Sequence, residues 1–73
     1  MPLIEVKVFK DELDKDQSAA IIAKITNVVV EVTNERIRPY TWVIINEVKN
    51  GQWGAGGKAL SLSDIRKITL DGS

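Results

Sequence analysis

Two strand-like stretches flank one long helical pattern, and this order restricts the possible folds more than any other feature of the sequence. Residues 2–9 alternate between apolar and polar side chains, as expected of a strand with one face in a core. Residues 41–48 (TWVIINEV) form a second stretch rich in strand-forming residues. A helix-containing connection of about thirty residues between strands usually makes a right-handed crossover with parallel strands. The order therefore predicts a β-α-β unit.

The helical pattern has a recognisable start. Asp14 and Gln17 have the spacing of a capping box, which predicts that a helix begins near Lys15 and runs to about Asn34. Residues 28–32 (VVVEV) alone also fit a strand, but two complementary stripes favour the helix. The apolar stripe is Ile21, Ile25, Val28, Val29 and Val32, and the polar stripe is Lys24, Asn27, Glu31 and Asn34.

The second strand is apolar on both faces, with Val43 and Ile45 on one face and Trp42 and Ile44 on the other. The helix can cover one face, and the other face requires another subunit. The chain has 73 residues, 44% of them hydrophobic, and no cysteine. A chain of this size has a marginal core of its own, and disulfides cannot reinforce it. The sequence therefore predicts an oligomer.

The remaining segments predict short elements. Residues 36–40 (RIRPY) are a connector in which Pro39 disfavours helix at the preceding residue. The glycine-rich stretch around Trp53 predicts a tight hairpin. Ser61 and Asp64 are suited to cap one short helical turn, and KITL to form a final edge strand. We therefore expect one α+β domain over residues 1–73, with two parallel strands, one long helix and a C-terminal β-hairpin.

Composition excludes several classes of function. Ten basic and ten acidic residues cancel, which argues against a nucleic-acid or anionic-membrane partner. No stretch approaches membrane-spanning length, so a cytoplasmic protein is expected. Without histidine or cysteine, the usual transition-metal ligands and the usual neutral-pH base are missing. We expect neither a metal nor a cofactor.

Several residues allow both a structural and a functional interpretation. The glycines of residues 51–57 fit a hairpin better than a phosphate-binding loop, because no sizeable helix is expected directly after them. Trp53 either packs on a partner or lines a pocket, and Trp42 belongs to the core or an interface. Arg36 and Arg38 are either exposed connector residues or a grip for a substrate carboxylate.

Pro2 also has two interpretations. Proline is tolerated at the start of a strand, where no ladder hydrogen bond is needed. Removal of Met1 would instead leave Pro2 with a free secondary amine, which can act as a base. Position alone does not decide between the two.

The combination of features is more specific than any one of them. An N-terminal Met-Pro on a strand, one helix, an apolar strand ending in IINEV, and then GQWGAGG together resemble the 4-oxalocrotonate tautomerase family. The resemblance covers nearly the whole chain. Its most specific part is the hairpin pattern of residues 51–57, with an aromatic residue at Trp53 and glycines at Gly51, Gly54, Gly56 and Gly57.

The resemblance implies an activity and an assembly. Family members associate, usually as homohexamers built as trimers of dimers. Met1 is removed, and the Pro2 nitrogen acts as general base and acid on an enol or keto acid, of the 2-hydroxydienoate or phenylenolpyruvate kind. Phe9 and Trp53 would then supply apolar walls, with Trp53 in place of the usual phenylalanine.

The sequence also departs from the family. Its best-studied members bind the substrate carboxylate and carbonyl with two arginines, one in the loop after the first strand and one in the second strand. That loop has no arginine here, and Trp42 occupies the other position. Lys10, Lys15, Arg36 and Arg38 are the candidate replacements. A non-catalytic binding protein, or an inactive subunit of a hetero-oligomer, is the alternative function.

Overall fold

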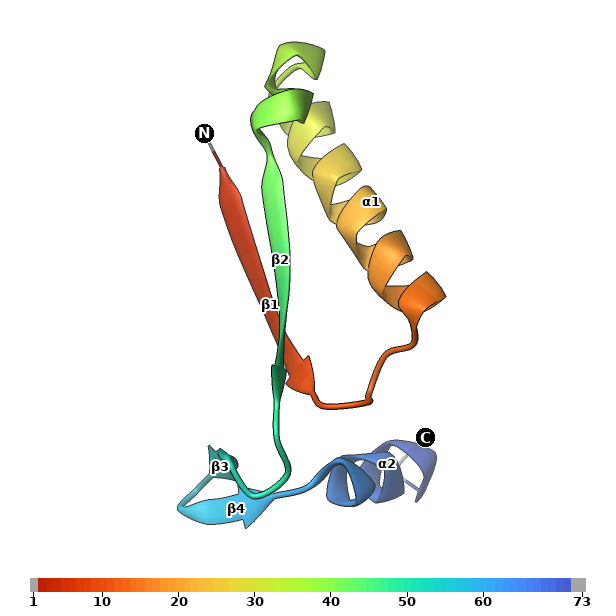
Figure 1. Cartoon of the computed structure of the whole chain (residues 1–73), viewed down its shortest axis with the longest axis vertical. Coiled ribbons are helices and arrows are strands. Elements are labelled where there is room, and N and C mark those ends of the chain that lie inside the picture. The colour runs from red at the N-terminus through yellow and green to blue at the C-terminus, as the bar shows by residue number, and fades with distance from the viewer. Residues whose placement is uncertain (1, 72–73) are drawn as a thin grey trace.

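The computed structural model describes residues 2–71, and these form the predicted α+β arrangement. In chain order the elements are β1 (Leu3–Phe9), α1 (Lys15–Val32), the 3-10 helix η1 (Glu35–Tyr40), β2 (Trp42–Val48), β3 (Trp53–Ala55), β4 (Lys58–Leu60) and α2 (Leu62–Asp71). β1 and β2 pair in parallel, and β3 and β4 pair antiparallel (Figure 1). The predicted β-α-β unit with a C-terminal hairpin is confirmed. Met1, whose removal the sequence predicts, lies outside the described residues.

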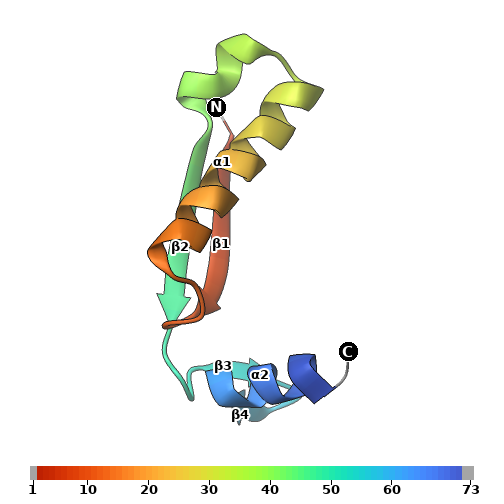
Figure 2. The same ribbon diagram turned by 90° about the vertical axis from the view of Figure 1, so that its right-hand side faces the viewer.

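The two-stranded sheet is covered on one face only. Helix α1 packs against β2 and lies over one face of the sheet (Figure 2). Ile4 and Val43, which pair across the two strands, are half-buried. Leu3 and Trp42 are paired on the opposite face, where they are 57% and 54% exposed, and Ile44 on the same face is 42% exposed. The expectation that one face of β2 lacks a cover within the chain is confirmed.

The side of α1 that is buried coincides only in part with the predicted apolar stripe. Ile21, Ile25 and Val29 are half-buried as expected, but the one buried residue of the helix is Val30. Val28 and Val32, which the stripe places on the sheet, are instead 59% and 81% exposed. Two strands make a narrow surface that covers only part of a wide apolar stripe, so the side of α1 bearing Val28 and Val32 remains open.

The predicted start of α1 is confirmed. The Asp14 carboxylate accepts the Gln17 N–H at 2.8 Å, and the Gln17 side chain accepts the Asp14 N–H at 2.9 Å. This reciprocal pair satisfies two backbone donors that the helix itself leaves free.

Loss of the cap is expected to be measurable. Asp14→Ala removes the acceptor for the Gln17 N–H, and we expect the free energy of unfolding to fall by about 1 kcal/mol. Urea denaturation followed by circular dichroism, at one fixed protein concentration, measures the change. Asp16→Ala, in the same first turn but outside the cap, is the matched control. Equal effects of the two substitutions would contradict a role for the cap.

The connector before β2 is more helical than predicted. Residues 35–40 form η1, which contains both Arg38 and Pro39. The Asn34 side chain accepts the Arg36 N–H at 3.0 Å and starts the turn, and the Arg38 carbonyl accepts the Thr41 N–H at 3.2 Å and ends it. A single short 3-10 segment makes few internal hydrogen bonds, so the missing N–H of proline costs little there.

The hairpin has the form that its glycines predict. Gly56 and Gly57 join β3 to β4 with φ of 59° and 83°. A two-residue turn with both angles positive matches the twist of the strands, and glycine adopts these angles without strain. The structural interpretation of these glycines is confirmed.

The prediction for the C-terminus was wrong in part. Ser61 and Asp64 do cap a helix, because the Asp64 carboxylate accepts the Ser61 N–H at 2.9 Å and the Ser61 hydroxyl accepts the Asp64 N–H at 3.3 Å. That helix is α2, which extends to Asp71 and includes the KITL segment predicted as an edge strand. Leu62, Ile65 and Ile68 have helical spacing, Leu62 is buried, and the described sheets offer KITL no strand partner.

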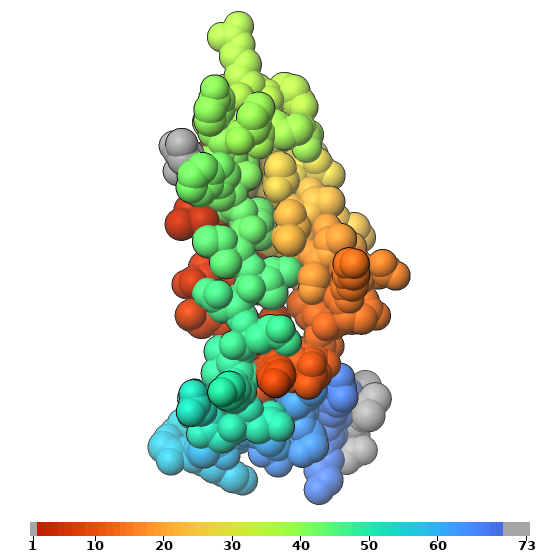
Figure 3. Space-filling view, viewed as in Figure 1, coloured from red at the N-terminus to blue at the C-terminus, as the bar shows by residue number. Residues whose placement is uncertain are grey.

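The chain by itself is long and thinly packed. Its radius of gyration is 15.1 Å and its extents are 42 × 24 × 22 Å (Figure 3), whereas a compact domain of this length has a radius of about 11 Å. Among the described residues, the buried apolar side chains are Val8, Phe9, Val30 and Leu62. So small a core favours association with other chains.

In the described part of the chain, no helix is both long and apolar enough to cross a membrane.

Candidate active site

Pro2 lies at one corner of the sheet. It immediately precedes β1 and is half-buried. Its carbonyl oxygen accepts a hydrogen bond from the Trp42 N–H at 3.0 Å, which continues the β1–β2 ladder by one residue beyond Leu3. The corner is therefore anchored through the backbone, and a side-chain change at Pro2 leaves that hydrogen bond in place.

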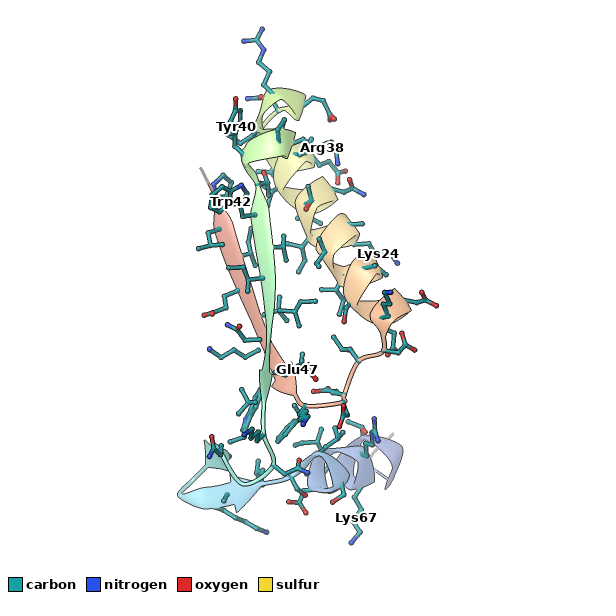
Figure 4. All side chains as sticks on the ribbon, viewed as in Figure 1. Lys24, Arg38, Tyr40, Trp42, Glu47 and Lys67 are labelled. Atoms are coloured by element: carbon teal, nitrogen blue, oxygen red, sulfur yellow. The ribbon has the colours of Figure 1, made fainter. Side chains whose placement is uncertain are left out.

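Exposed apolar side chains surround this corner. Trp42 faces Leu3 across the parallel pair, and Tyr40 comes two residues earlier in η1. All three are more than half exposed. Figure 4 shows the Tyr40 and Trp42 side chains on the same side of the chain, next to the start of β1. We call Leu3, Tyr40 and Trp42 the apolar shelf.

Phe9 and Trp53 lie together at the opposite end of β1. Their rings stack with centroids 4.5 Å apart and an angle of 20° between the planes. Phe9 is only 3% exposed, whereas Trp53 is half-buried. Phe9 therefore acts mainly as a core residue beneath Trp53, and the exposed part of the pair belongs to Trp53.

The predicted site residues thus form two groups that one chain cannot bring together. Seven residue steps separate Pro2 from Phe9 along an extended strand, which is about 23 Å. Trp42 lies at the Pro2 end, and Trp53 and Lys10 lie at the Phe9 end. A small substrate cannot touch both ends of β1.

Arg38 already has partners within the chain. Its Nε donates to Glu35 at 2.5 Å, its Nη2 donates to the other Glu35 oxygen at 3.3 Å, and its Nη1 donates to Asn27 at 2.9 Å (Figure 4 labels Arg38). The hydrogen bond from Arg38 lowers the pKa of Glu35, and the same bond raises the pKa of Arg38. Arg36, two residues earlier, is exposed.

The two lysine candidates lie near the Phe9 end. Lys10 is exposed directly after β1, where its N–H donates to the Val48 carbonyl at 2.9 Å. Lys15 lines an open cavity of about 310 Å³ between the start of α1 and the end of the sheet. The other residues that line this cavity are Val8, Leu13, Asp14, Ser18 and Glu47. Pro2 is not among them, so the cavity is separate from the proline.

Glu47 has a structural role that the sequence does not reveal. Its carboxylate accepts the N–H of Asp11 at 2.9 Å and fixes the loop between β1 and α1, where Asp11 has a φ of 68° (Figure 4 labels Glu47). The two residues are 36 positions apart, so no local pattern pairs them. Parallel pairing of Val8 with Glu47 brings the carboxylate to the loop.

Comparisons of sequence identify related proteins. A family model described as "Tautomerase enzyme" matches residues 2–63. "Probable tautomerase K2" of Dickeya dadantii (strain 3937) is 31% identical over 61 residues, which are 84% of this chain and 90% of that protein. "Probable tautomerase Cj0270" of Campylobacter jejuni is 33% identical over 60 residues, which are 82% and 87% of the two chains.

Solved structures agree with the sequence comparisons. DmpI from Helicobacter pylori has a TM-score of 0.72 at 25% identity and covers 90% of this chain and 97% of its own. A 4-oxalocrotonate tautomerase homologue has a TM-score of 0.69 at 20% identity, with 81% and 90% of the chains covered, and so shares the fold. The resemblance to 4-oxalocrotonate tautomerases is confirmed. Because the family model spans most of the chain, this protein belongs to the tautomerase family, and its membership supports an isomerase activity of the tautomerase type.

Proposed function

We propose that this protein is a keto–enol tautomerase in which the nitrogen of Pro2, freed by removal of Met1, carries the proton. The main supporting observation is the position of Pro2, half-buried at an anchored corner beside the exposed side chain of Trp42. The substrate is an enol or keto acid, and the reaction is an isomerisation.

The proton balance of this reaction is simple. The neutral amine removes the proton from the enol hydroxyl, and the C=O bond forms as the C=C electrons move to the distal carbon. The protonated amine then returns a proton to that carbon, which leaves the keto form and the neutral amine. One group serves as base and then as acid, and no cofactor or oxidant is consumed.

An N-terminal amine suits this role in a chain without histidine. Ordinary α-amino groups have a pKa of about 7.7–8.0, so a substantial fraction is neutral near pH 7. Apolar surroundings or a nearby cation disfavour the charged form and lower the pKa further. Trp42 and Leu3 supply apolar surroundings at this corner.

We propose that two chains complete each site. The outer edge of β1 has no strand partner in the described sheet. Antiparallel pairing of this edge with β1 of a second copy places the start of one strand beside the end of the other. Trp53 and Lys10 of the second copy then lie near Pro2, and the two-fold symmetry of such a pair makes two identical sites. Free strand edges favour this kind of pairing.

Roles in substrate binding follow from this arrangement. Lys10 of the second copy holds the substrate carboxylate and, as a cation, lowers the pKa of the Pro2 amine. Trp53 of that copy forms an apolar wall, and Phe9 supports it from beneath. Arg36 is a further cation at the Pro2 end, whereas Arg38 is engaged by Glu35 and contributes less.

Further association covers the remaining apolar surface. Val28 and Val32 of α1 are exposed in the single chain. Three pairs of chains arranged as a homohexamer, a trimer of dimers, would bury these side chains. The large radius of gyration and small core of the single chain support such an assembly.

The pH dependence of the reaction tests the role of the amine. The neutral amine is the active base. We therefore expect kcat/KM with phenylenolpyruvate to be low at pH values below the pKa of Pro2 and to rise as the pH increases through that pKa. We expect that pKa to lie below about 7.7. Titration of the Pro2 nitrogen by NMR, on protein shown by mass spectrometry to lack Met1, measures the same pKa directly. A value near that of free proline would contradict the mechanism.

A non-catalytic role is the second candidate. The engagement of Arg38 by Glu35 and Asn27 supports it, because an arginine held in this way is less available to a substrate. In that role the protein is an oligomeric binding protein or an inactive partner in a hetero-oligomer. Uniform retention of Met1 in cell-expressed protein would favour this candidate, because the Pro2 nitrogen would then be an amide without basicity.

A further inference from the structure

We infer that the Pro2 site selects enol and keto acids that carry a flat apolar or aromatic substituent in place of a second carboxylate, and that Trp42 makes this selection. The inference rests on the proposed tautomerase function and names the substrate class of that site. It depends on how Trp42 is held, on what surrounds it and on how the nearby charges are paired.

The backbone of Trp42 is fixed by its own hydrogen bond and by the residue before it. Its N–H donates to the Pro2 carbonyl at 3.0 Å, which ties the indole-bearing residue directly to the residue that carries the reactive nitrogen. The preceding residue, Thr41, is buried, and its hydroxyl donates to the Ile37 carbonyl at 2.9 Å. A large ring on a fixed backbone loses little conformational entropy when a ligand packs on it.

The indole has free surface despite its fixed backbone. Trp42 is 54% exposed. Leu3 and Tyr40, the other two residues of the apolar shelf, are exposed to a similar extent. Aromatic side chains gain from burial of their faces and from offset or edge-to-face contacts with another ring. A substrate whose reactive carbons lie at Pro2 can therefore rest a flat substituent on this shelf.

Glu5 and Arg38, two charged residues near the shelf, have partners within the chain. Glu5 follows Leu3 on the same face of the sheet, where it accepts from Asn46 and pairs with Lys7 at 3.6 Å. Arg38, at the same end of the molecule, is held by Glu35. Arg36 is exposed in η1 but is not part of the shelf. A second substrate carboxylate packed against Leu3, Tyr40 and Trp42 would lose water without gaining an ionic partner from these three residues, which is costly. An apolar substituent has no such cost.

A comparison of two substrates on the processed protein tests the inference. Phenylenolpyruvate carries an aromatic ring, and 2-hydroxymuconate carries a second carboxylate. We expect kcat/KM for the aromatic substrate to exceed that for the dicarboxylate by about tenfold or more. Trp42→Ala should lower the ratio of kcat/KM for phenylenolpyruvate to kcat/KM for 2-hydroxymuconate about tenfold, mainly by raising KM for phenylenolpyruvate.

Further variants separate the ring from other effects. Trp42→Phe keeps a flat ring and should keep most of the preference, whereas Trp42→Arg supplies a cation and should shift the preference toward 2-hydroxymuconate. Ile44→Ala, two residues on and on the same sheet face, is the matched control for loss of apolar surface. It should leave the ratio of the two kcat/KM values unchanged. Size-exclusion chromatography and circular dichroism check assembly and folding of each variant.

The outcomes distinguish this inference from the function on which it rests. If Pro2→Ala abolishes turnover of both substrates but the Trp42 variants leave their ratio unchanged, the tautomerase function stands and the selection by Trp42 is wrong. If Pro2→Ala has no effect on either substrate, the proposed function fails. If Trp42→Ala dissociates the oligomer and Trp42→Arg, in protein that remains assembled, does not shift the ratio toward 2-hydroxymuconate, Trp42 belongs to a subunit interface, which also overturns the inference.

Discussion

Replacement of Pro2 by alanine is expected to lower kcat/KM with phenylenolpyruvate by about a hundredfold or more, because a positioned general base contributes roughly 10² to 10⁴ in rate. The variant still has an N-terminal amine after removal of Met1, but this amine is primary and rotates freely about its bond to Cα. The hydrogen bond between residue 2 and Trp42 is made by backbone atoms and is retained. We therefore expect a folded protein with low activity, measured by the ultraviolet absorbance of the enol.

A second variant separates the amine from the side chain. One extra bulky residue inserted between Met1 and Pro2 keeps the proline but converts its nitrogen into an amide, because the inserted residue is joined to that nitrogen by a peptide bond whether or not Met1 is removed. Its activity should fall at least as far as that of Pro2→Ala. Wild-type rates in either variant, with the N-terminus established by mass spectrometry, would rule out Pro2 as the proton carrier.

The largest effect on stability is expected from Phe9→Ala. Phe9 is 3% exposed and stacks on Trp53, so its removal leaves a cavity in a core that has few buried side chains. Such substitutions lower the free energy of unfolding by about 3–5 kcal/mol. A chain of this length has about 4–11 kcal/mol in total, so the variant should be mostly unfolded on moderate heating. Thermal and urea denaturation at one protein concentration measure the loss.

Two further substitutions control for this result. Phe9→Leu retains much of the side-chain volume and should cost clearly less than Phe9→Ala. Ile68→Ala removes apolar atoms from α2, where Ile68 is 63% exposed, and should change the free energy of unfolding by less than about 0.5 kcal/mol. If Phe9→Ala and Ile68→Ala had equal effects, the Phe9–Trp53 pair would not be part of the core.

The fold was predictable where the sequence pattern is local and repeated. The alternation in β1, the capping box at Asp14 and the glycine pair after Ala55 each specify an element within a few residues. The KITL segment was assigned wrongly because its strand-like residue types are also compatible with a helix, and only the absence of a strand partner in the described sheets decides. The burial of Val30 in place of Val28 depends on where a narrow sheet meets α1, which periodicity alone does not specify.

The candidate site was less predictable than the fold. Pro2 was selected through the resemblance to a family, and its catalytic role stays a prediction; the structure shows that it lies at an anchored sheet corner. The pairing of Arg38 with Asn27 joins residues 11 positions apart, and it depends on how η1 folds back on α1. The distance between Pro2 and Phe9 follows from the length of β1. That Trp53 stacks on Phe9, and so lies far from Pro2 in the same chain, is seen only in the structure.

The length of β1 has a consequence for how the sequence can change. In the paired arrangement proposed above, the length of β1 sets the distance between the two active sites of the pair. Pro2 lies at the start of the strand in one site, and Lys10, directly after its end, lies in the other. Deletion of one residue within β1 would shorten this distance by about 3.3 Å and turn every later side chain of the strand to the opposite face of the sheet. Substitutions within β1 that preserve the alternation leave this spacing intact, whereas insertions and deletions damage two sites at once.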